Sequence, residues 1–218
     1  MAGKSPLIQV TLVALAAGSL CGARLAAQVG EKERLEKTLA EFSRELVTLE
    51  QSPSLAPSVH QAKQRIQWFE GKLASWSPAS ADEGRPLREG LEIDLQALRQ
   101  LPADPDAALG VVAEVEADLA VKAAHCKQAG LSALVTTKVR TFRTGQEVTG
   151  LEVFYIQKVL EPKPPANPPR FPALSATEQK LAPGRYVFWA GTPADTPVKS
   201  TIAVGNGEPE TRIELLVR

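Results

Sequence analysis

The feature that most constrains this fold is a change in hydrophobic spacing at Gly130. Before Gly130, apolar residues recur at alternating intervals of three and four residues, which places them along one stripe of a helix. After Gly130, β-branched residues cluster in short runs that are separated by Gly, Pro and Asn, a pattern typical of strands. The sequence therefore predicts an α+β protein in two segregated parts, residues 28–130 helical and residues 131–218 a small antiparallel β-sandwich or open barrel of six or seven strands.

Four amphipathic stripes precede Gly130. They comprise Leu35, Leu39, Phe42, Leu46 and Leu49; Val59, Ala62, Ile66, Phe69, Leu73 and Trp76; Leu87, Leu91, Leu95, Leu98 and Leu101; and Leu109, Val112, Val115, Leu119, Ala123 and Cys126. Ser58 and Gln61 have capping-box spacing, and Asp104 before Pro105 indicates another helix start. Short connections favour an antiparallel bundle within one chain. The near-heptad spacing leaves open a homo-oligomeric coiled coil that pairs residues 31–76 between chains.

Turn signals divide the second part. Thr144-Gly145-Gln146 separates two strand-like runs, and Pro183-Gly184 predicts a type II turn. Asn206-Gly207 predicts a tight hairpin between the runs on either side of it.

The stretch from Leu174 to Val217 resembles the PEGA and carboxypeptidase-regulatory-like domains. The resemblance is carried by Leu181-Ala-Pro-Gly-Arg-Tyr-Val-Phe-Trp189, then Thr201-Ile-Ala-Val-Gly205, then Thr211-Arg-Ile-Glu-Leu-Leu-Val217. It implies a prealbumin-like β-sandwich of the kind found in secreted and envelope proteins of bacteria. It also implies an accessory or binding module, because the family carries no catalytic residues. The helical part resembles no family that we recognise.

Residues 161–172 contain six prolines. Proline fixes φ and has no N–H to donate to a sheet, so this segment is expected to be extended, exposed and stiff. Two interpretations stand: a rigid loop that crosses one end of the sandwich, or a docking site in which Pro165 and Pro168 contact a partner.

The first 27 residues predict where the protein is located in the cell. Lys4 precedes an apolar run and small residues follow through Ala27, the layout of a secretory signal peptide cleaved after Ala23 or Ala27. A retained membrane anchor and a lipoprotein modified at Cys21 are the alternatives. The prediction is a periplasmic or secreted protein that meets a membrane only through an uncleaved signal segment.

Composition narrows the function. The chain has 25 basic and 25 acidic residues, and cleavage after Ala27 would remove Lys4 and Arg24 and leave a net charge of −2. A nucleic-acid binder needs a basic excess, so that class is disfavoured. We find no nucleotide-binding, zinc-protease or serine-hydrolase motif. The sequence predicts no catalytic residues, no metal ligands and no cofactor.

Three sets of side chains near the end of the helical part could in principle take part in catalysis or metal binding. Cys126 falls on an apolar stripe, which predicts an inert core thiol, with an intermolecular disulfide as the alternative. Glu114, Asp118 and Lys122 follow at four-residue intervals, which predicts a solvated, salt-linked helix face. His125 is expected to interact with the helix dipole near the end of its helix.

Trp68 lies off the helical stripe and Trp189 lies on the strand face opposite Tyr186 and Phe188, so both are candidate partner-binding residues. The leading hypothesis is a non-enzymatic, envelope-associated binding or scaffolding protein whose partner is a protein or a cell-envelope component. The alternatives are an oligomeric coiled coil and a glycan-binding or hydrolytic module on the sandwich.

Overall fold

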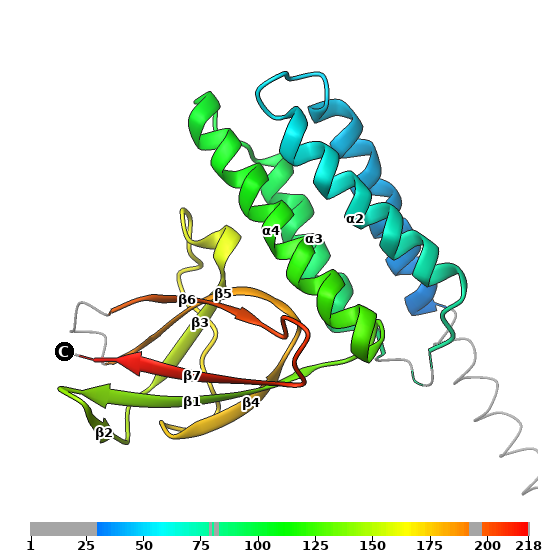
Figure 1. Ribbon diagram of the computed structural model, residues 1–218. Coiled ribbons are helices and arrows are strands. Elements are labelled where there is room, and N and C mark those ends of the chain that lie inside the picture. Colours follow the sequence, from blue (N-terminus) through cyan, green and yellow to red (C-terminus); the bar gives the residue numbers. More distant parts are fainter. Residues whose placement is uncertain (1–29, 79, 81–82, 192–197, 218) are drawn as a thin grey trace, which may run out of the picture.

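The computed structural model describes residues 30–78, 80, 83–191 and 198–217, which form four helices followed by seven strands in two sheets (Figure 1). The helices are residues 30–49, α2 (Ala56–Ala74), α3 (Arg85–Arg99) and α4 (Pro105–Ala129). The strands are β1 (Val135–Arg143), β2 (Gln146–Val148), β3 (Val153–Gln157), β4 (Thr177–Leu181), β5 (Gly184–Ala190), β6 (Ser200–Val204) and β7 (Glu210–Leu216), with a 3-10 turn, η1 (Lys158–Leu160), after β3. The predicted α+β class is confirmed. The predicted signal segment lies outside the described residues.

The four stripes converge on one helical core. Nearly all their members are buried together, and the 30–49 helix contributes Leu35, Leu39, Phe42 and Leu46 at 0–1% exposure. Leu109 is the exception, since it is 37% exposed and its neighbour Ala108 is buried instead. The stripe that a coiled coil would pair between chains is thus already buried within this one.

The helix starts were predicted with mixed success. Asp104 caps α4 as expected, because its Oδ2 accepts a hydrogen bond from the Ala107 N–H at 2.9 Å. The Ser58 cap is wrong: α2 begins at Ala56, and its first residues continue a turn in which Ser52 O accepts from the N–H groups of Leu55 and Ala56.

One sheet is built around β1. β7 lies on one edge of β1, and β4 and β2 pair with successive stretches of β1 along the other. The β1–β7 pair is parallel, so the expectation of a wholly antiparallel sandwich is wrong for this pair. The second sheet has the order β3–β5–β6 and is antiparallel throughout.

Of the three predicted turns, only Thr144-Gly145-Gln146 joins two strands that pair with each other. Thr144 and Gly145 both have positive φ, 49° and 82°, and join β1 to β2 in the arrangement of a type I′ turn. The Asn206-Gly207 hairpin is wrong, because β6 pairs with β5 whereas β7 crosses to the other sheet beside β1. The type II turn predicted at Pro183-Gly184 is wrong, because Gly184 has a φ of 156° and is already the first residue of β5, so this pair bends the chain from one sheet to the other.

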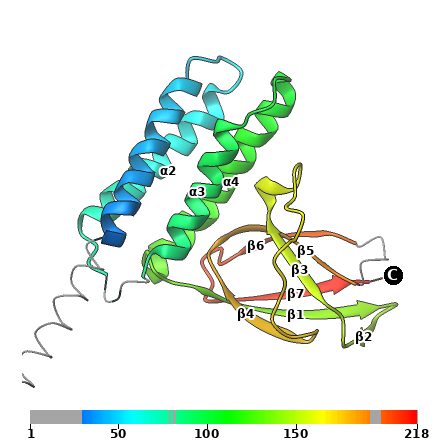
Figure 2. The same cartoon turned by 180° about the vertical axis from the view of Figure 1, so that it is seen from behind.

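The sandwich core lies between the sheets, with Val139, Phe188 and Leu215 almost fully buried. Two edge strands, β3 and β4, face each other where the sandwich is open, and Gln179 Nε2 of β4 donates to the Tyr155 hydroxyl of β3 at 3.2 Å. The proline-rich segment passes along this opening, as Figure 2 shows from behind.

The 161–172 segment is largely exposed, as predicted, and it shields the edge of β3. Tyr155 N–H donates to Pro169 O at 3.0 Å, and Phe171 N–H donates to Val153 O at 2.9 Å. An edge strand covered in this way is protected from pairing with other chains.

Candidate binding site at the junction of bundle and sandwich

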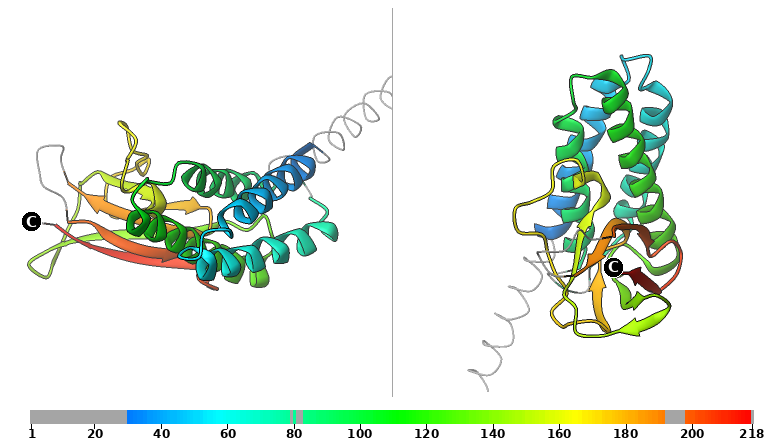
Figure 3. Two further views of the ribbon diagram at one scale, coloured as in Figure 1. Left: turned by 90° about the horizontal axis from the view of Figure 1, so that it is seen from above. Right: turned by 90° about the vertical axis from the view of Figure 1, so that its left-hand side faces the viewer.

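The bundle stands on one end of the sandwich, and α4 packs on β5 (Figure 3). Two contacts from Arg185 at the start of β5 tie the parts together. Its backbone N–H donates to Asp118 Oδ1, and its guanidinium lies 3.0 Å from the Glu114 carboxylate. Glu114, Asp118 and Lys122 therefore face neighbouring elements, and the predicted solvated face is wrong. The helical period of α4 could not show this, because Arg185 of the covering strand lies 67 residues after Asp118 and 71 after Glu114.

Lys122 is the centre of a buried charge cluster at this junction. Its side chain is fully buried, and its ammonium donates to the carboxylates of Asp94 and Asp118 and to Gly90 O at 3.2 Å. Gly90 leaves room for this approach, since a Cβ there would make a tight contact of 3.1 Å with Lys122 Cε. We call Lys122, Asp94 and Asp118 the junction cluster.

The junction cluster has a structural role, because its charges neutralise one another inside the protein. Burial by itself would lower the pKa of Lys122, but the charges of Asp118 and Asp94 outweigh it and raise that pKa above its ordinary value. Burial, assisted by the Asp118 charge, raises the pKa of Asp94 well above the usual range. Lys122 is therefore a permanent cation whose three N–H donors are all engaged, which is the opposite of what a nucleophilic lysine requires.

A cleft of about 410 Å³ lies beside the cluster, between α3 and the open side of the sandwich. We call it the junction cleft. It is lined by Pro86, Glu89, Gly90 and Ile93 of α3; Leu134; Tyr155, Ile156, Gln157 and Leu160; Pro165 and Pro169; and Gln179, Lys180, Leu181, Ala182 and Tyr186. Four separate stretches of the sequence, residues 86–93, Leu134, residues 155–169 and residues 179–186, thus contribute lining residues to one cleft.

The junction cleft combines apolar walls with a few polar atoms, the usual character of a ligand site. Gln157 is only 9% exposed, and neither its Oε1 nor that of Gln179 has a hydrogen-bond partner among the described residues. Tyr186 is satisfied, because its hydroxyl donates to Ala182 O at 3.1 Å, and burial raises the pKa of that hydroxyl. Gln157, Gln179 and Tyr155 were not singled out from the sequence. Gln157 carried a signal, since it is a polar residue at the end of the apolar run of β3, whereas Gln179 lies in the polar strand β4 and carried none.

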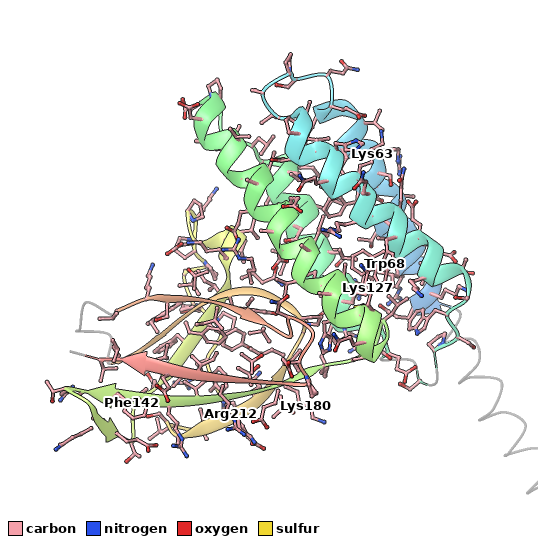
Figure 4. All side chains as sticks on the ribbon, viewed as in Figure 1. Lys63, Trp68, Lys127, Phe142, Lys180 and Arg212 are labelled. Atoms are coloured by element: carbon pink, nitrogen blue, oxygen red, sulfur yellow. The ribbon has the colours of Figure 1, made fainter. Side chains whose placement is uncertain are left out.

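The residues predicted to bind partners are scattered. Pro165 is exposed and lines the junction cleft, whereas Pro168 is half-buried and lies outside its lining. Trp68 is half-buried against the helical core, with the amines of Lys127 and Lys72 at 5.5 and 5.9 Å from its ring centroid. Figure 4 shows Trp68 and Lys127 adjacent between α2 and α4.

Trp189 lies elsewhere again, on the outer face of the second sheet. It stacks on Phe154 with ring centroids 5.7 Å apart, and the Lys199 amine lies 5.8 Å from its ring centroid. On the same face Val187 is fully buried. This strand face is therefore covered at one end and half-exposed at Trp189, and Trp68 and Trp189 do not form one site.

Neither family models nor curated proteins nor solved structures gave a match for this chain. Across the residues that the structure describes, no helix is long and apolar enough to cross a membrane. Within the same residues, no group of three or more His, Cys, Asp or Glu side chains is arranged to hold a metal ion.

Cys126 and His125 both lie inside the protein. Cys126 is a free, buried thiol, and burial raises its pKa to about 12, which keeps it protonated and inert as predicted. His125 is 1% exposed, next to Gly205 at the β6–β7 turn, and burial lowers its pKa, which disfavours the protonated form that would interact with the helix dipole.

We expect His125 to make stability fall in mild acid. Burial lowers the pKa of His125 below its ordinary 6.5, so below that pH the unfolded chain takes up a proton that the folded chain resists. Stability is therefore lost as pH falls from about 6.5 toward the lower folded pKa, by at most about 1.4 kcal/mol per pH unit. Urea unfolding at pH 7.5 and 5.5 should show a smaller loss for His125→Gln than for the parent protein. Equal losses would contradict this, and exposed His60→Gln is the control.

Proposed function

We propose that this protein is a secreted or periplasmic, non-enzymatic binding or scaffolding protein of the cell envelope, and that it takes its partner in the junction cleft. The observation that carries the binding role is the pair of unpartnered amide oxygens of Gln157 and Gln179 in a hollow lined mainly by apolar groups. Groups of this kind gain hydrogen bonds when a ligand supplies donors.

Two further observations support the proposal. In the charge cluster nearest the cleft, the Lys122 ammonium donates to Gly90 O, Asp94 and Asp118, so the cluster serves to hold the bundle against the sandwich. The proposed location rests on residues 1–27 and their resemblance to a signal peptide. The proposed binding role agrees with the resemblance of the stretch from Leu174 to Val217 to PEGA domains.

The junction cleft can be tested with matched surface leucines. Leu134 is 39% exposed and lines the cleft, whereas Leu174 is 52% exposed and lies outside it. A pull-down from envelope extract should lose its specific partner with Leu134→Arg and keep it with Leu174→Arg. Retention of every captured protein by Leu134→Arg would overturn the proposed site. Loss with Trp189→Ala instead would move binding to the outer face of the second sheet.

A further inference from the structure

Two residues that line the junction cleft, Gln157 and Gln179, carry hydrogen-bond acceptors without partners among the described residues. Gln157 is nine-tenths buried and its Oε1 has no donor within the described chain; Gln179 is half-buried as a residue, and its Oε1 likewise has no donor there. A buried amide oxygen without a donor carries an uncompensated desolvation cost. An occupant that offers two N–H groups would remove that cost at both positions.

The same place offers a donor. The Tyr155 hydroxyl oxygen accepts from Gln179 Nε2 at 3.2 Å, which leaves its own proton for an acceptor. Acceptors and a donor side by side match the peptide group, which carries one N–H and one C=O per residue. A ligand with only acceptors, such as a phosphate, fits Gln157 and Gln179 poorly.

The backbone of β4 adds a second hydrogen-bonding surface. β4 pairs with β1 on one side, and across the part of the chain that the structure describes no strand pairs with its other edge. Residues 179–182, at the end of β4 and just after it, line the cleft. An exposed strand edge binds an extended peptide by strand addition, in which backbone hydrogen bonds give affinity and side-chain hollows give specificity.

The walls define the length and character of the occupant. Pro86 and Ile93 lie seven residues apart on α3, which corresponds to about 10 Å along a helix, the span of about three residues in an extended strand. Ile93, Leu160 and the Tyr155 ring form the apolar part of the wall, and the charged lining residues Glu89 and Lys180 have opposite signs. The cleft is thus suited to an uncharged, apolar side chain.

We infer that the junction cleft binds an extended peptide segment of a partner protein. About three residues lie in the cleft, their backbone pairs with Gln157, Gln179 and the edge of β4, and their central side chain is apolar. This inference rests on the proposed function and specifies the chemistry of its partner.

The experiment is a selection of a phage-displayed heptapeptide library on the whole protein, with depletion on the Leu134→Arg variant. Enriched peptides are expected to share a central apolar residue. Calorimetry with a synthetic copy of the most enriched peptide should show that Gln157→Leu and Gln179→Leu each reduce the affinity of the protein for that peptide about tenfold or more. Gln61→Leu, at an exposed position on α2, should leave the affinity unchanged.

Thermal unfolding of the same variants separates binding from structure. Because Gln157→Leu removes an unpartnered acceptor, its Tm should stay level or rise while peptide affinity falls. A parallel fall of Tm and affinity would overturn the binding role of Gln157. Failure to enrich any peptide, or equal affinity for the parent, Gln157→Leu and Gln179→Leu proteins, would overturn the inference. A partner that is still lost from Leu134→Arg in the pull-down would then leave the proposed function standing.

Discussion

Replacing Lys122 with methionine is expected to lower the free energy of unfolding by about 3–5 kcal/mol, the cost of breaking a buried ion pair by removing one partner. Methionine has nearly the length of lysine and fills the same space, so little of the loss should come from a cavity. What remains is a pair of buried carboxylates, Asp94 and Asp118, without a cation. Urea unfolding followed by tryptophan fluorescence at neutral pH measures the loss.

Two variants make the Lys122 result interpretable. Lys37→Met on the exposed surface of the 30–49 helix should change stability by no more than about 0.5 kcal/mol. Adding Asp94→Asn and Asp118→Asn to Lys122→Met removes the uncompensated charge, so this triple variant should recover a large part of the loss. A triple variant no more stable than Lys122→Met would show that packing, rather than charge, explains the effect.

The parts of this fold that could be predicted from the sequence depend on local patterns. The stripe from Leu35 to Leu46 and the cap at Asp104 are decided within one or two helical turns, and both are confirmed. Thr144-Gly145 makes its hairpin because the strands on either side of it pair with each other. Asn206-Gly207 looks equally favourable, yet β7 pairs with β1, a decision that depends on the whole sandwich.

The candidate site could not be predicted for the same reason. Gln157 and Gln179 are ordinary polar residues until α3 and the proline-rich segment close over the open side of the sandwich. Lys122 looked like a surface residue because its four-residue spacing from Asp118 also suits a solvated ion pair. Trp68 and Trp189 were predicted to bind a partner because they are tryptophans that lie off the expected core faces. In the structure each packs against a neighbouring aromatic ring, in a different part of the protein.

Gly205→Ala is expected to cost about 2–5 kcal/mol, from about 1–2 for a left-handed alanine and about 1–3 for overpacking. Gly205 has a φ of +78° at the point where the end of β6 meets α4 and the start of β1. A Cβ there would overlap Val135 Cγ2 and lie 3.0 Å from His125 Nδ1. Because those side chains are buried, neither can move aside easily.

Gly145→Ala is the matched control for Gly205→Ala. Gly145 has nearly the same φ, +82°, but a Cβ there would have nothing within 4 Å, so only the backbone cost of about 1–2 kcal/mol should appear. The difference between the two variants in urea unfolding therefore measures crowding where the bundle meets the sandwich. Equal losses would mean that Val135 and His125 yield to the added methyl group, so that packing around Gly205 adds nothing to the backbone cost.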